Sequence, residues 1–77
     1  MINYRLEFIL NTYNGDLATI KNSLLEFGNS LAIDPAQETD ESGGCNFKIN
    51  IQTEDPTIIF DICGQFGRIK SVKVEET

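Results

Sequence analysis

Residues 11–17 are the segment of this sequence whose residue types and spacing best suit the binding of a ligand. Asn11, Asn14, Gly15 and Asp16 lie between an alternating apolar stretch and a helical pattern. Free backbone N–H groups at a helix start, a glycine that allows close approach, and asparagine side chains can together hold a carboxylate or another small polar ligand. The same residues also suit a simple capped turn, in which Asn14 or Asp16 accepts from the first helical N–H groups. Both interpretations stay open at this point.

Residue types that support catalysis are few in this chain. It has no histidine, so imidazole bases and imidazole metal ligands are excluded, and Ser23, Ser30 and Ser42 have no base to activate them. Cys45 and Cys63 cannot supply the four ligands of a structural zinc site, and we expect both to be free and mostly buried thiols. The acidic residues at 38–41 lack the spacing of an EF-hand loop, which favours a solvated hairpin tip. We therefore expect no enzymatic activity, no metal and no cofactor.

The composition is that of one small globular domain, residues 1–77. Apolar residues make up 40% and charged residues 23% of the chain. Twelve acidic and six basic residues give a net charge of −6, which disfavours nucleic acid and anionic membranes as partners. Because no apolar run has the length of a signal peptide or membrane span, we expect no membrane partner and a cytoplasmic location.

Hydrophobic periodicity predicts six elements. Apolar residues alternate with polar ones in four segments, whereas two others repeat at spacings of three and four. The second helix has the stronger start signal, because Thr53, Glu54 and Asp55 precede a proline at the first helical position. Gly28 follows the first helix where a left-handed cap is expected. The predicted strands are 4–10, 30–39, 45–53 and 69–75, and the predicted helices are 17–27 and 56–66.

The two halves of the chain resemble each other, which indicates a duplicated strand–helix–strand unit. Residues 10–12 and 51–53 end the first strand of each half, and Phe27-Gly28 and Phe66-Gly67 end each helix. The order predicts an α+β, ferredoxin-like βαββαβ fold, with a four-stranded antiparallel sheet and two helices on one face. The second and fourth strands should form the edges, and Pro35 fits an edge strand.

Alternation assigns a direction to each strand side chain. Cys45, Phe47, Ile49 and Ile51 should point toward the helices, and so should Val72 and Val74 in the last strand. Phe47 lies in the middle of the best-patterned strand, so we expect it to contact both helices and to be the most important core side chain. The open face then carries charged and amide side chains but no aromatic residue, unlike RNA-binding modules of this topology.

The order and spacing of these elements resemble those of an ACT domain, a small ligand-sensing module of amino-acid metabolic enzymes. The family's first turn has the pattern Asp-x-Pro-Gly-x-Leu, and residues 12–17 match it at Gly15 and Leu17, with Thr12 and Asn14 at the Asp and Pro positions. Residues 27–33 and 66–74 are similar to the family's helix ends and following strands. The resemblance spans residues 4–75.

The resemblance implies a stand-alone regulatory domain that binds a small metabolite, often an amino acid, where two copies of the domain meet. It places the ligand between the first turn of one copy and the second strand of the other. This implies a homodimer and a site formed by Asn11, Asn14, Gly15, Asp16, Ala32 and Ile33. The alternative is a ligand-free adaptor of the same fold, which binds another protein.

Overall fold

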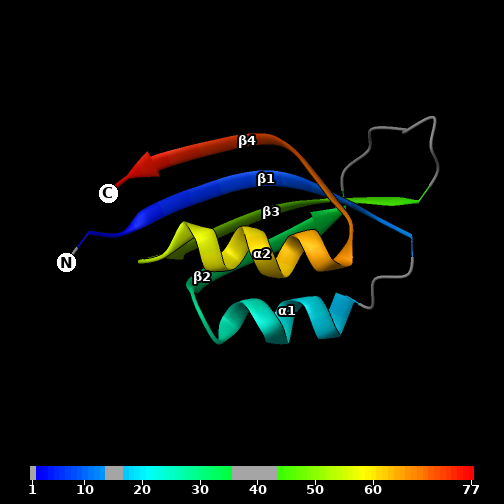
Figure 1. Ribbon diagram of the computed structural model, residues 1–77, viewed down its shortest axis with the longest axis horizontal. Coiled ribbons are helices and arrows are strands. Elements are labelled where there is room, and N and C mark those ends of the chain that lie inside the picture. The colour runs from blue at the N-terminus through cyan, green and yellow to red at the C-terminus, as the bar shows by residue number, and fades with distance from the viewer. Residues whose placement is uncertain (1, 14–16, 36–43) are drawn as a thin grey trace.

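Six elements follow one another in the computed structural model, which describes residues 2–13, 17–35 and 44–77 (Figure 1). Their order is strand, helix, strand, strand, helix, strand, as the periodicity predicts. They are β1 (Tyr4–Thr12), α1 (Leu17–Leu25), β2 (Asn29–Pro35), β3 (Cys45–Thr53), α2 (Pro56–Phe66) and β4 (Arg68–Glu76).

The strands form one antiparallel sheet in the order β2-β3-β1-β4, and both helices cover the same face of it (Figure 1). The ferredoxin-like prediction is therefore confirmed, with β2 and β4 at the edges. The chain ends lie at one corner, where the backbone N–H of Thr77 donates to the carbonyl oxygen of Asn3 at 2.8 Å.

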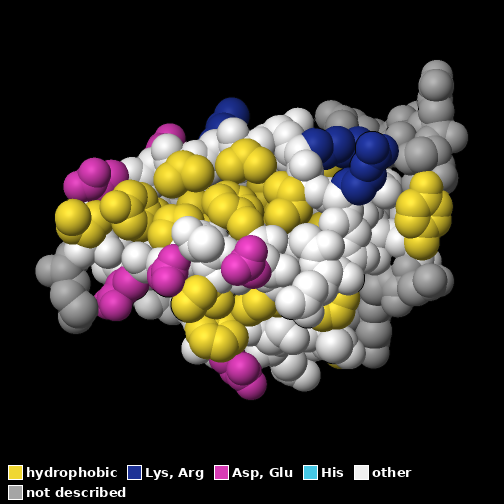
Figure 2. All heavy atoms as spheres, viewed as in Figure 1, with side chains coloured by type: hydrophobic (Ala, Val, Ile, Leu, Met, Phe, Trp, Pro, Cys, Tyr) yellow, Lys and Arg dark blue, Asp and Glu magenta, His cyan; other side chains and the backbone are white. Residues whose placement is uncertain are grey.

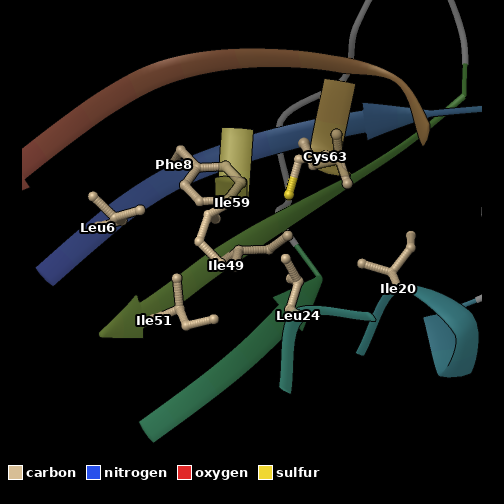
Figure 3. Close-up of a cluster of buried hydrophobic side chains, with 9 residues drawn as sticks. Leu6, Phe8, Ile20, Leu24, Ile49, Ile51, Ile59 and Cys63 are labelled. Carbon is tan, nitrogen blue, oxygen red and sulfur yellow. The ribbon is translucent and has the colours of Figure 1, made fainter. Parts of the chain in front are cut away.

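Nine apolar side chains fill the space between the helices and the sheet (Figure 3). Each is at most 1% exposed, and Phe8 in β1 is the largest of them. The rings of Phe8 and Phe60 meet edge to face with centroids 5.6 Å apart, a favourable arrangement for aromatic pairs. The nine are Leu6, Phe8, Leu10, Ile20, Leu24, Ile49, Ile51, Ile59 and Cys63.

The element ends differ from the predictions by a few residues. β1 continues past Leu10 to Thr12 because Asn11 and Thr12 still pair with Asn46 and Cys45 of β3. α1 ends at Leu25 rather than Phe27, and a turn follows in which the N–H of Phe27 donates to the carbonyl oxygen of Leu24. The predicted end of the second strand (36–39) and most of the predicted loop at 40–44 lie outside the described residues. The start of α2 is as predicted, with Asp55 accepting from the N–H of Thr57.

Four side chains that were expected to be buried are less covered than alternation predicts. Cys45 is exposed and Phe47 only half-buried, because the start of β3 extends past the ends of both helices in Figure 1. Val72 and Val74 have the predicted phase, but they are 48% and 49% exposed. Their strand, β4, curves away from α2 and has no helix above it (Figure 1).

Two matching joints fasten the helix ends to the sheet. Each joint consists of a threonine at the end of a central strand and the Phe-Gly pair at the end of a helix. In the first, the Thr12 hydroxyl donates to the carbonyl oxygen of Phe66 at 2.8 Å. In the second, the Thr53 hydroxyl donates to the carbonyl oxygen of Phe27 at 2.8 Å. The repeat seen in the sequence therefore corresponds to a repeated tertiary contact.

The glycines of the two joints are needed because backbone approaches them closely. A Cβ atom on Gly67 would collide with the carbonyl oxygen of Asn11. A Cβ atom on Gly28 would lie 2.8 Å from the carbonyl oxygen of Gln52. The left-handed cap expected at Gly28 is wrong, since the positive-φ glycine of the described chain is Gly44. What requires glycine at position 28 is close packing on β3.

We predict that Gly67→Ala destabilises the protein by about 1–3 kcal/mol or more, because the added methyl group must displace strand backbone. Gly64→Ala is the matched control, since no atom lies within 4 Å of a Cβ there. In the helix interior that change should stabilise by about 0.5–1 kcal/mol. Urea unfolding of the two variants compares them directly, and a neutral Gly67→Ala would contradict the close-packed joint.

We also predict that Phe8→Ala costs more stability than Phe47→Ala, in contrast to the expectation from the sequence. Removal of a fully buried phenylalanine side chain should cost about 3–5 kcal/mol. Half-buried Phe47 has less apolar surface to lose. The free energies of unfolding of both variants, from chemical denaturation, test this order, and the reverse order would show that the start of β3 is better covered than described.

Candidate functional site

The residues that the sequence singled out for ligand binding lie at the end of β1. Asn11 is 1% exposed and lies opposite Asn46, which is 6% exposed, on the sheet face away from the helices. The side-chain Nδ2 of Asn11 donates to Oδ1 of Asn46 at 2.7 Å. These two residues form the amide pair. The pair is buried, although the alternation of β3 places Asn46 on the open face of the sheet. Burial makes the pair a fixed polar element at this end of the sheet.

The other predicted site residues are not brought to the amide pair within one chain. Ala32 and Ile33 belong to edge strand β2 and lie opposite Asn50 and Ile49, well along β3 from Asn46. Asn14, Gly15 and Asp16 lie outside the described residues. Ala32 is exposed, whereas Ile33 packs against the core. A site that includes both groups would need β2 of a second copy, as the resemblance implies.

A groove of about 420 Å³ lies beside the second joint, between the end of α1, the end of β3 and the start of α2. Its walls carry the carboxylates of Glu26, Glu54 and Asp55, together with Phe27 and Ile58. Phe27 is 47% exposed, so its ring is open to solvent. Such walls favour a cationic group over an anion. The residues that line the groove come from separate segments of the chain. No local sequence pattern therefore indicates that they lie together.

The open face of the sheet holds an ion pair at its centre. Lys48 Nζ lies 2.8 Å from Oε1 of Glu7 on the neighbouring strand. The hydrogen bond and charge of Lys48 lower the pKa of the Glu7 carboxyl, and those of Glu7 raise the pKa of Lys48. Both side chains are in contact with solvent, so this cross-strand pair orders the surface more than it stabilises the fold.

Cys63 is placed for packing and not for nucleophilic chemistry. It is fully buried in α2, and burial raises the pKa of its thiol to about 12. The reactive thiolate is therefore scarce near neutral pH. Both cysteines are free, as predicted, although Cys45 is exposed. In the described part of the chain no group of three or more Cys, Asp or Glu side chains could hold a metal ion.

No helix among the described residues is long and apolar enough to cross a membrane. No curated protein matches the chain. A family model for the middle domain of proteins that resemble FakA, a component of fatty acid kinase, matches residues 1–77. The matched family is not the ACT family, so the ACT resemblance is supported at the level of the ferredoxin-like fold only. The chain belongs to the FakA-like middle-domain family.

Proposed function

We propose that this chain is a non-catalytic regulatory domain of a FakA-like fatty acid kinase protein, and that it acts by association. The observation that carries the proposal is the family match over residues 1–77 to the middle domain of such proteins. The fold agrees with this role. Its interior is filled by core side chains, so that a partner or effector would meet the sheet edges and open surfaces. Two free thiols suit the reducing conditions of the cytoplasm, where we place this role.

The specific form of the proposal is a homodimer through β2, with a small effector such as an amino acid at the interface. In the described sheet β2 pairs with β3 on one side only, so its other side presents backbone groups that can bind another strand. Exposed Ala32 would let a second copy approach closely. The effector would lie between the Asn11 end of one copy and Ala32 and Ile33 of the other.

A second candidate is the ligand-free adaptor. The amide pair favours it, because the Asn11 side-chain amide already donates to Asn46 inside the folded chain. In this form the end of β1 is a structural support, and the sheet edges contact another protein directly. The two candidates differ in one observable property, which is whether a small molecule stabilises the folded state.

We predict that the wild-type chain is a dimer by light scattering at tens of micromolar, and that Ala32→Lys makes it monomeric. The lysine would place a charge at the centre of the strand contact. Val74→Lys, on the opposite edge, is the matched control and should leave the mass unchanged. A monomeric wild type would contradict self-association, and a dimer unaffected by Ala32→Lys would move the interface away from β2.

Melting curves with each of the twenty amino acids at millimolar concentration separate the two candidates. A ligand that binds only the folded state stabilises it by about 2.7 kcal/mol at a hundred times its Kd. A rise in Tm with one amino acid, lost in Ala32→Lys, supports the effector site. Unchanged melting with all twenty, in a chain that still dimerises, supports the adaptor.

A further inference from the structure

The basic residues of this acidic protein gather on one face. The chain has six of them, and strand register places five on the open face of the sheet. Among the described residues, Glu7, Asp34 and Glu75 are the acidic residues that the register places on that face, so the described part of the face has two net positive charges in a chain of net charge −6. The five are Arg5, Lys48, Arg68, Lys70 and Lys73.

The positive charge is concentrated toward β4. Lys48 is paired with Glu7 and lies opposite Asp34, so it is largely compensated. The other four bases, Arg5, Arg68, Lys70 and Lys73, lie on β1 and β4, and we call them the basic stripe. Arg5 and Lys73 line a hollow of about 180 Å³ together with Glu7, Asn50 and Glu75. The two carboxylates lie opposite Lys73 and Arg5 and offset part of their charge, although neither base forms a salt bridge within the described ranges.

Apolar side chains lie on the other face of the same strand. Val72 and Val74 alternate with the bases of β4 and point to the helix side, where they are about half exposed. Figure 2 shows a band of hydrophobic side chains where β4 runs alongside α2. β4 is therefore basic on the open face and apolar on the helix face, and no helix covers the apolar side (Figure 1).

The backbone edge of β4 is also the more regular of the two sheet edges. Residues Lys73–Glu76 pair in unbroken register with β1, and the irregularity of β4 is confined to the bulge at Ser71, whose φ is 56°. The described part of β2 contains Pro35 and loses register between Asn29 and Ala32. Proline and bulges hinder strand addition, so the regular segment Lys73–Glu76 gives β4 a free edge for an added strand, while β2 keeps a shorter regular stretch before Pro35.

We propose that β4 binds an extended peptide segment of alternating acidic and apolar residues as a fifth strand of the sheet. Main-chain hydrogen bonds to β4 would provide affinity, and side-chain alternation would provide specificity. The acidic side chains of the segment lie beside the basic stripe, and its apolar side chains cover Val72 and Val74. A nucleic acid fits poorly, because the open-face positions of β1, β3 and β4 carry no aromatic residue for stacking.

This inference goes beyond the proposed function, since it concerns a different partner and the opposite edge. The probe is a capped seven-residue peptide of alternating glutamate and valine, and the control peptide has lysine in place of glutamate. In low salt we expect the glutamate peptide to bind and to shift the backbone amide NMR signals of β4 and of Arg5. The lysine peptide should bind at least about fivefold more weakly, because like charges would lie side by side.

Charge reversal at one position tests the geometry. Lys73→Glu should weaken binding of the glutamate peptide about five- to tenfold, since it exchanges an attractive cross-strand pair for a repulsive one. Lys21→Glu in α1 changes the net charge equally and should change binding less than twofold. Melting curves of both variants establish that they fold.

Five results would overturn the proposal. The first three are the absence of binding by the glutamate peptide at millimolar concentration, equal binding of the two peptides, and amide shifts centred on β2. The fourth is tighter binding of a twelve-residue oligothymidylate, which would assign the basic stripe to nucleic acid. A dimer that Val74→Lys dissociates but Ala32→Lys does not would place a second copy on β4. That result would overturn both this inference and the β2 dimer, whereas a failed peptide experiment alone leaves the β2 dimer intact.

Discussion

The crossed attachment of the two helices to the two central strands is the contact on which the rest of the structure depends. Thr12, in the first half of the chain, holds the end of α2, and Thr53, in the second half, holds the end of α1. Each half therefore holds the helix end of the other half. The close approach of Gly67 to Asn11 also fixes the end of β1, where the amide pair lies.

Much of this fold could be predicted from the sequence because local patterns determine it. Period-two and helical spacing give the element order, and the repeated Phe-Gly and strand-end triplets indicate the duplication. How far the helices bury the side chains of the edge strands could not be predicted in the same way. Val72 and Val74 have the predicted phase, yet how far a helix reaches over an edge strand is a tertiary property. The burial of the amide pair likewise depends on contacts between segments that are distant in sequence, and single-strand alternation carries no information on it.

The distribution of charge over the surface could likewise not be predicted from the composition. A net charge of −6 argues against anionic partners when the protein is treated as one uniform surface. The sheet separates the charges, with bases on the open face and the carboxylates of Glu26, Glu54 and Asp55 around the groove beside the second joint. A small domain of the FakA-like middle-domain family thus has two edges and two faces of different chemistry. That arrangement agrees with the proposed role of the domain in association.

The most direct test of the crossed attachment is a urea unfolding comparison of Thr12→Val and Thr53→Val. Valine has nearly the same shape, so each change removes the hydroxyl and leaves a helix-end carbonyl group without its donor. We expect each variant to lose about 1–3 kcal/mol of unfolding free energy. The loss should be larger for Thr53→Val, because the Thr53 hydroxyl also accepts from the N–H of Asp55 at 3.1 Å. A loss below about 0.3 kcal/mol in either variant, well under the usual value of such a bond, would contradict the crossed attachment.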